Sequence, residues 1–166
     1  MSTIGDFTRA RRNSPSGDPG VDRLDLAAID HRLISMKKSI EQLESYGPLN
    51  TSLLEDKPAA GLVAERIMFF LADLAVEING YLARGVAHRF PRGESESYLA
   101  AVSAGVIDAE LVPRLIPDEG PHHVLLQLSL DSDPEAVEAI VAEALSAYGA
   151  YTQQVSAWVR SEGARG

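Results

Sequence analysis

Hydrophobic residues recur at helical spacing along most of this chain. Between about Asp22 and Tyr46 the apolar positions alternate between spacings of three and four residues, which is an a/d seam. Asp22 supplies an N-cap, and Gly47-Pro48 ends the helix. The pattern is typical of a helix in a bundle or a dimer. The seam consists of Leu26, Ile29, Leu33, Met36, Ile40 and Leu43.

After a connection over 48–58, a second helix is predicted at about 59–84, and it is apolar on most sides. A helix of this kind lies in the centre of a bundle or at an interface. One bundle interior is too small to absorb this surface together with the seam of the first helix, so we expect a homodimer. The apolar positions are Val63, Ile67, Phe70, Leu74, Ile78 and Tyr81, flanked by Met68, Phe69, Leu71, Ala75 and Leu82.

The middle of the chain predicts shorter helices. One covers about 94–104 and ends at Gly105, which suits the left-handed residue after a helix. Another begins at an Asp108 cap. Prolines and a glycine then interrupt the pattern, so we expect a break near 118–120. The helix restarts over 121–130, with proline at its first position.

The last helix has the clearest start signal. The run 131–135 (DSDPE) joins an aspartate cap, a proline and acidic residues in the first turn. The helix continues to about Arg160. Strand alternation is absent apart from the short run 124–130. The predicted fold is therefore all-α, an antiparallel up-and-down bundle of four main helices with short helices between them.

Length and composition are those of a globular domain. A chain of 166 residues fits one domain and is long enough to bury a core without disulfides. Hydrophobic residues make up 45% of it and charged residues 23%. We place a disordered N-terminal arm at 1–21, which is polar and rich in Gly, Pro and Ser. The helical domain then occupies 22–160, followed by a tail at 161–166.

Cysteine and charge exclude several classes of protein. The chain has no cysteine, which rules out disulfides, thiolate zinc sites and cysteine nucleophiles and suits the cytoplasm. Its longest nearly uncharged apolar run, 67–72, is too short to cross a membrane. The net charge is −9, and residues 1–23 carry four arginines against three aspartates, which leaves −10 for the rest. Such a surface repels phosphate backbones and disfavours general nucleic-acid binding.

Candidate catalytic residues are few. His31 lies off the seam of the first helix and is expected at the surface, and His88 sits in a predicted loop with two arginines. The pair His122-His123 is the most unusual feature, and we expect it to begin a surface helix. Adjacent side chains on a helix point about 100° apart, so the pair is poorly suited to one metal ion. No HExxH, paired Glu-x-x-His or glycine-rich phosphate loop is present, so we expect neither metal nor cofactor.

From about Ile29 to Trp158 the order of elements resembles the HepT-like toxins of the HEPN superfamily. Their first helix is similar to IDHRLISMKKSIEQLESY, and their second to LLEDKPAAGLVAERIMFFLADLAVEINGYLA, including Glu65-Arg66 and Asn79. Their tyrosine helix with its Gly-Val-Ile turn resembles SYLAAVSAGVIDAELVPRL, and their Asp-Pro-capped last helix resembles DSDPEAVEAIVAEAL. The resemblance implies a homodimer that cleaves RNA without metal and is controlled by a nucleotidyltransferase antitoxin.

In that family an Arg-x4-His-x-Tyr ribonuclease motif precedes the Asp-Pro cap. Counting back from Asp133-Pro134 places the three motif positions on His122, Gln127 and Ser129. Cleavage of this kind needs a group that titrates near neutral pH and a cation for the phosphate. Gln127 does not titrate, and Ser129 is not the tyrosine that the antitoxin adenylylates. The resemblance therefore implies the toxin of a toxin–antitoxin system with weakened or lost RNA cleavage.

Two alternatives remain open. The chain is either a catalytically silent HepT-like protein that binds a nucleotidyltransferase, or a small helical scaffold without nucleotide chemistry. If RNA is a substrate, His122 is the expected acid or base and His123 the second candidate. The analogy brings the motif helices of two protomers together, so that two imidazoles face one phosphate.

Overall fold

The structure is a computed structural model that describes residues 24–165, so the predicted disordered arm at 1–21 lies outside the described residues. No strand occurs in this part of the chain, and the prediction of an all-α fold is confirmed. Three helices are long: α1 (Leu26–Glu44), α3 (Ala59–Ala87) and α7 (Val137–Arg165). The shorter elements are α2 (Thr51–Asp56), α4 (Glu94–Ser103), η1 (Ala109–Leu111), α5 (Val112–Leu115), α6 (His122–Ser132) and η2 (Pro134–Ala136).

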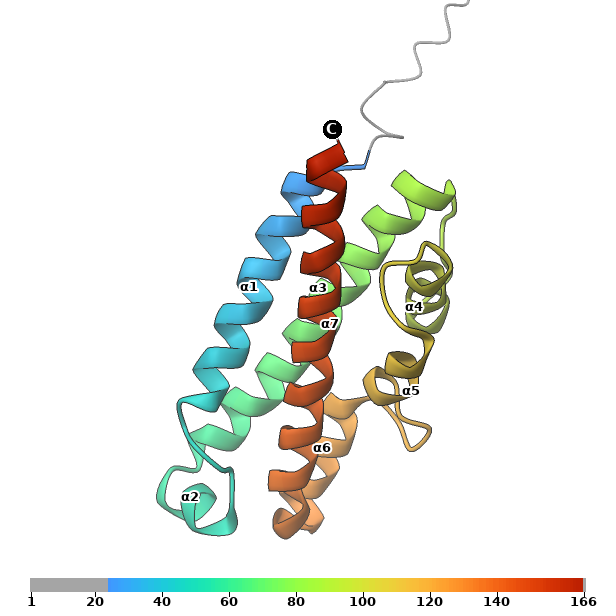
Figure 1. The fold of residues 1–166 in the computed structure, drawn as a ribbon. Helices are drawn as coiled ribbons and strands as arrows, with labels where there is room; N and C mark the ends of the chain where they lie inside the picture. Colours follow the sequence, from blue (N-terminus) through green and yellow to red (C-terminus); the bar gives the residue numbers. More distant parts are fainter. Residues whose placement is uncertain (1–23, 166) are drawn as a thin grey trace, which may run out of the picture.

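The long helices run between the lower and upper ends of the molecule, and α3 crosses diagonally behind α7 (Figure 1). The chain descends through α1, turns through α2 at the lower end, and returns upward through α3. It then descends through α4, α5 and α6, and α7 leads back to the upper end. None of the helices within 24–165 has the length and apolar character needed to cross a bilayer.

The seam of α1 faces the interior of this one chain. Ile29, Leu33, Met36, Ile40 and Leu43 are all buried, and they belong to the same hydrophobic core as residues of α3 and α7. Of the two apolar surfaces on which the homodimer prediction depends, the seam of α1 is thus covered within one chain. By contrast, α3 exposes large apolar side chains that the core does not take up.

Local polar contacts set the start of α1 and create a helix in the first connection. Asp25 rather than Asp22 caps α1, since its Oδ1 accepts the Ala28 N–H at 2.9 Å. In the connection, Asn50 accepts the Leu53 N–H at 2.9 Å and so caps α2, a short helix that the sequence pattern did not predict.

Other helix boundaries differ from the prediction by a few residues. α3 continues to Ala87 and ends at His88, which adopts the left-handed conformation with φ +51°. Pro121 is the cap of α6 rather than its first helical residue. α7 extends to Arg165, so most of the predicted tail is helical. Glu162 and Arg165 pair at 3.2 Å across the last turn and support this extension.

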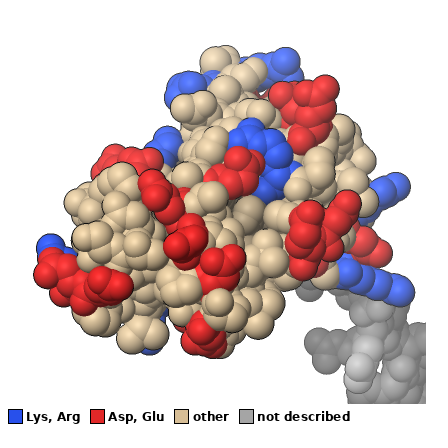
Figure 2. Space-filling model, turned by 90° about the horizontal axis from the view of Figure 1, so that it is seen from below, with Lys and Arg blue, Asp and Glu red and all other residues tan. Residues whose placement is uncertain are grey.

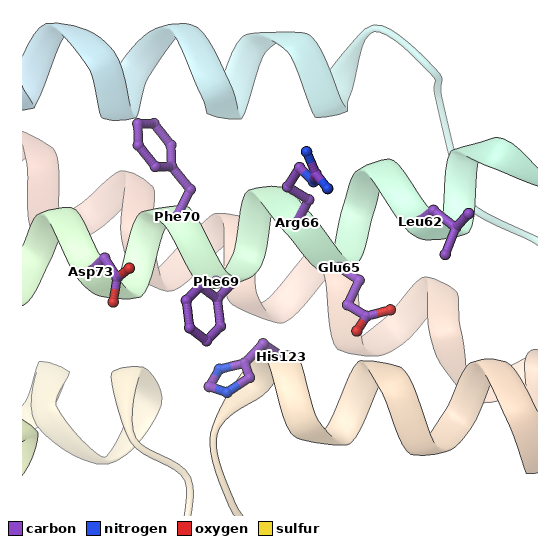
Figure 3. Close-up of a pocket in the computed structure, with 7 residues that line it drawn as sticks. All are labelled: Leu62, Glu65, Arg66, Phe69, Phe70, Asp73 and His123. Atoms are coloured by element: carbon purple, nitrogen blue, oxygen red, sulfur yellow. The ribbon is translucent and has the colours of Figure 1, made fainter.

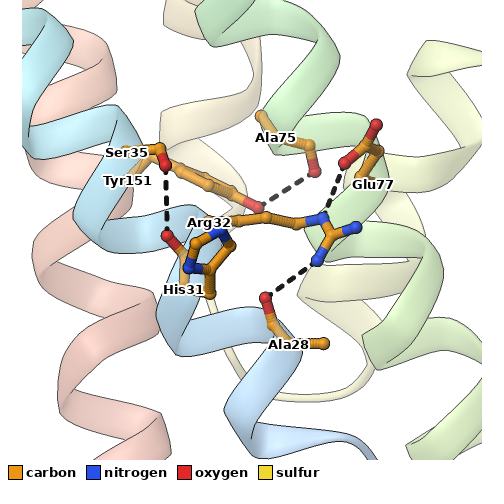
Figure 4. A network of polar contacts seen from close by, with 7 residues as sticks. All are labelled: Ala28, His31, Arg32, Ser35, Ala75, Glu77 and Tyr151. Carbon is orange, nitrogen blue, oxygen red and sulfur yellow. Dashed lines mark hydrogen bonds and ion pairs between the residues drawn. The ribbon is translucent and has the colours of Figure 1, made fainter.

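Hydrogen bonds between buried groups cross the core, and Figure 4 shows one of them, from the Tyr151 hydroxyl to the Ala75 carbonyl. The Tyr151 hydroxyl of α7 lies 2.6 Å from Asn79 Oδ1 and 3.2 Å from the Ala75 carbonyl, both on α3. The Asn79 amide donates in turn to Ser97 of α4 at 3.2 Å. Buried polar groups need such partners, so these bonds fix how α7, α3 and α4 lie against one another.

The lower end of the molecule is acidic. Figure 2 views this end and shows carboxylates over much of it. Exposed acidic residues of α2, α6, η2 and α7 gather there, in keeping with the net charge of −9. They are Glu55, Asp56, Asp131, Glu135 and Glu138.

Candidate functional site

The positions that match the ribonuclease motif lie on α6 but not on one face of it. His122 is buried, Gln127 is exposed and Ser129 is partly buried. Five residues along a helix amount to a rotation of about 140°, which turns Gln127 away from His122. Seven residues restore the direction, but Ser129 then lies about 10 Å further along the axis. The side chains at the three motif positions therefore do not come together within one chain.

His122 is part of the core. It is 4% exposed, and its Nε2 lies 2.7 Å from the carbonyl oxygen of Arg114. Its ring also meets Tyr148 edge-on, with the centroids 6.2 Å apart. The Arg114 carbonyl belongs to the last turn of α5, where carbonyls lack partners within the helix. A ring N–H of His122 supplies that partner, so the expectation of a surface position is wrong for this residue.

His123 points about 100° further around the helix than His122 and reaches the surface between α6 and α3. Its ring stands edge-on to Phe69, with 5.0 Å between the centroids. Together they line a hollow of about 580 Å³, which we name the α3–α6 groove (Figure 3). The groove is lined by Leu62, Glu65, Arg66, Phe69, Phe70, Asp73 and His123.

Glu94, at the start of α4, lies close enough to His123, Asp73 and His122 for their charges to affect its pKa. Partial burial raises the pKa of its carboxyl group, because the charged form loses solvation. His123 and, more weakly, His122 act in the other direction, while the Asp73 carboxylate adds to the rise. The groove itself combines two carboxylates, an imidazole and the Arg66 guanidinium group with the apolar side chains of Leu62, Phe69 and Phe70.

The α3 side of this groove could have been predicted from the sequence, although the ribonuclease motif does not include it. Polar residues interrupt the apolar pattern of α3 at Glu65, Arg66 and Asp73, which are spaced as one helical stripe. Phe69 and Phe70 fall within that stripe and are exposed with it. The prediction counted both phenylalanines in the apolar surface of this helix and left open whether a bundle interior or an interface covers it, since apolar residues alone do not mark which side faces solvent.

The other histidines lie elsewhere. His31 is exposed on α1, as expected, and His88 is exposed at the end of α3. Within the described residues no group of three or more His, Asp or Glu side chains is placed to hold a metal ion.

No protein-family model matches the chain, and no curated protein matches it.

Proposed function

We propose that this protein is a catalytically silent HepT-like protein that acts through contacts with other proteins, with a nucleotidyltransferase as its expected partner. In this proposal it forms the antiparallel up-and-down bundle and the homodimer of that group. The observation that carries the proposal is the surroundings of His122, which stands where the family motif has its arginine. It is buried and bound to the Arg114 carbonyl, not presented to a phosphate.

The two remaining motif positions support the same conclusion. Gln127 is exposed but does not titrate, so it provides no acid or base. Ser129 has no phenol for the antitoxin to modify. The charge of the protein also disfavours RNA cleavage, since a net charge of −9 repels the phosphate backbone of RNA. What remains accessible is an apolar helix face, which is typical of a protein interaction site.

RNA cleavage by the purified protein tests the proposal. We expect no cleavage above background and no growth arrest on expression. Gln127→His and Ser129→Tyr together restore two motif groups at positions that are not fully buried, and His122→Arg completes the motif. The double variant is the safer comparison, because arginine at the buried position 122 places a charge in the core. Cleavage by the natural chain at the rate of the restored variants contradicts the proposal.

Weak RNA cleavage centred on His123 is the second candidate function. His123 and Arg66 line the same groove, and together they offer an imidazole and a guanidinium group. If this function is correct, His123→Ala and Arg66→Ala each reduce cleavage at least tenfold, while the exposed His31→Ala does not. Cleavage that stops only on addition of a chelator comes from a contaminating metal nuclease.

A further inference from the structure

A second hollow lies against the C-terminal half of α3, between this helix, α1 and the loop before α4. It measures about 310 Å³, near the lower end of the range for small-molecule sites, roughly 300–1,000 Å³. It shares no lining residue with the α3–α6 groove. We name it the Arg84 hollow. The side chains that matter for its chemistry are Arg32, Glu77, Tyr81, Arg84 and Phe90.

Two guanidinium groups lie against one aromatic ring in this hollow. The Cζ atom of Arg32 is 4.8 Å from the centroid of the Tyr81 ring, and the Cζ atom of Arg84 is 5.1 Å from it. Cations within about 6 Å of an aromatic centroid are attracted to the face of the ring. Tyr81 therefore helps to hold both arginines at the hollow despite their like charge.

A carboxylate neutralises only one of these arginines. Arg32 Nε donates to Glu77 Oε2 at 2.6 Å, and its Nη1 donates to the Ala28 carbonyl at 3.1 Å (Figure 4). Within residues 24–165 no carboxylate pairs with Arg84. Two arginines and one glutamate give the lining a charge of +1, in a chain whose net charge is −9. The hollow is therefore a locally positive site on an acidic protein.

Gly80 leaves room for the Arg84 guanidinium to lie back along α3. A Cβ atom added at Gly80 would meet the two terminal nitrogens of Arg84, at 3.6 and 4.0 Å. The guanidinium thus lies close over the preceding turn of the helix, and Arg84 is only partly exposed. A planar guanidinium held in this way can offer two parallel N–H donors to a carboxylate.

The loop after α3 supplies an apolar wall. His88 ends the helix in the left-handed conformation, and Phe90 and Pro91 beyond it line the hollow. Phe90 is 75% exposed, more than any other large apolar side chain in the described part of the chain. A flat apolar group stacked on this ring removes apolar surface of both partners from water.

We propose that the Arg84 hollow binds a small carboxylate that carries a flat apolar ring, the class of the aromatic carboxylic acids. The carboxylate accepts hydrogen bonds from the Arg84 guanidinium, and the ring lies against Phe90 and Pro91. A single negative charge matches the +1 of the lining, whereas the two charges of a phosphate ester exceed it. The inference goes beyond the proposed function and does not depend on it, because the hollow contains none of the ribonuclease-motif positions.

Calorimetric titration of the full chain with benzoate tests the proposal. We expect a Kd of about 1 mM or lower, in keeping with the few atoms of this ligand. Acetate has the charge without the ring, and phenyl phosphate has the ring with a second charge, so each should bind at least tenfold more weakly. Absence of benzoate binding overturns the proposal. Acetate that binds as tightly as benzoate overturns the role of the ring, and phenyl phosphate that does so overturns the choice of a carboxylate.

Variants of the lining show whether benzoate binds in this hollow. Arg84→Gln should weaken binding at least tenfold, and Arg84→Lys should keep only part of the affinity, because an ammonium group lacks the two parallel donors. Gly80→Leu should abolish binding by filling the hollow while it leaves the charges in place. Arg160→Gln removes an exposed charge of α7 and is the matched control, so its affinity for benzoate should equal that of the natural chain.

Melting temperature gives a second measurement that also shows whether each variant is folded. Each variant should first give the helical circular dichroism of the natural chain. Benzoate at about ten times its Kd should then raise the melting temperature of the natural chain and of Arg160→Gln by about 3 °C. Arg84→Gln and Gly80→Leu should show no such rise. An equal rise in all four proteins overturns the assignment of the ligand to the Arg84 hollow.

Discussion

At the scale of single residues, two tyrosines in the same cluster have different surroundings. The rings of Tyr98 and Tyr151 meet edge-on, 5.9 Å apart, and both side chains are fully buried. The Tyr151 hydroxyl bonds to Asn79, whereas the Tyr98 hydroxyl has no hydrogen-bond partner within residues 24–165. A buried polar atom without a partner is destabilising, so the two hydroxyls contribute to stability with opposite sign.

Removing these hydroxyls should therefore have unequal effects. Tyr151→Phe should lower the free energy of unfolding by about 1–2 kcal/mol, because Asn79 then loses a buried partner. Tyr98→Phe should be neutral or slightly stabilising. Urea unfolding of both variants measures the difference, and an equal loss in the two would contradict the assignment.

The adjacent histidines should differ in the same way. His122→Ala removes a buried ring and leaves the Arg114 carbonyl without its partner, so it should cost about 2–3 kcal/mol of stability. His123→Ala removes a partly exposed ring and should cost less than about 1 kcal/mol. Thermal and urea unfolding give both values. If His123→Ala lost more stability than His122→Ala, the ring of His123, and not that of His122, would be the one that stabilises the fold.

At the scale of helices, glycines inside α3 and α7 stand in different surroundings. A Cβ atom added at Gly85 would lie 2.8 Å from the Leu24 Cα, so the close approach of the chain before α1 requires glycine there. A Cβ atom at Gly149 of α7 would meet nothing within 4 Å. Glycine weakens a helix unless packing requires it, and of these two positions it is Gly85 that packing requires.

Alanine substitutions should separate these two cases. Gly149→Ala should raise the free energy of unfolding by about 0.5–1 kcal/mol, the usual helix preference for alanine. Gly85→Ala should lower it despite the same preference, because backbone atoms have to move apart. The melting temperatures of the two variants should thus shift in opposite directions, and a gain for both would mean that Leu24 packs elsewhere.

At the scale of the whole molecule, the tyrosine cluster joins α4 to α7 and makes the fold sensitive to alkaline pH. Burial raises the pKa of Tyr98 and Tyr151 well above the ordinary 10.0, with further increases from the neighbouring Tyr148 phenol. Burial is also the main cause of the raised pKa of Tyr148. In the unfolded chain these phenols ionise near their ordinary value.

Stability should therefore decline in strongly alkaline solution. The free energy of unfolding should be unaffected by these groups below about pH 9, where the phenols are neutral in both states. Above pH 10.0 the unfolded chain loses these protons first, so stability should fall steadily. Melting temperatures between pH 8 and 12 measure the decline. Tyr98→Phe should reduce its slope, and an unchanged slope would contradict the role of this phenol.

Local signals along the chain were enough to predict the helices and most of the core. Apolar positions at helical spacing, together with glycine and proline signals, placed the main helices within a few residues of their observed ends. These signals are local, since they depend on neighbouring residues along the chain. Side-chain caps such as Asp25 are local as well, but several acidic residues near the start of α1 meet the same requirement.

Which surfaces are covered and which side chains meet depends on contacts between helices that are distant in the sequence. The direction of His122 depends on an unpaired carbonyl of α5, and the exposure of Phe69 and Phe70 depends on how α1 and α6 flank α3. The sequence pattern treats an apolar residue in the core and one awaiting a partner alike, because hydrophobicity gives a tendency to be buried and not the identity of the covering surface. Contacts between distant segments supply that information, and they exist only in the folded chain.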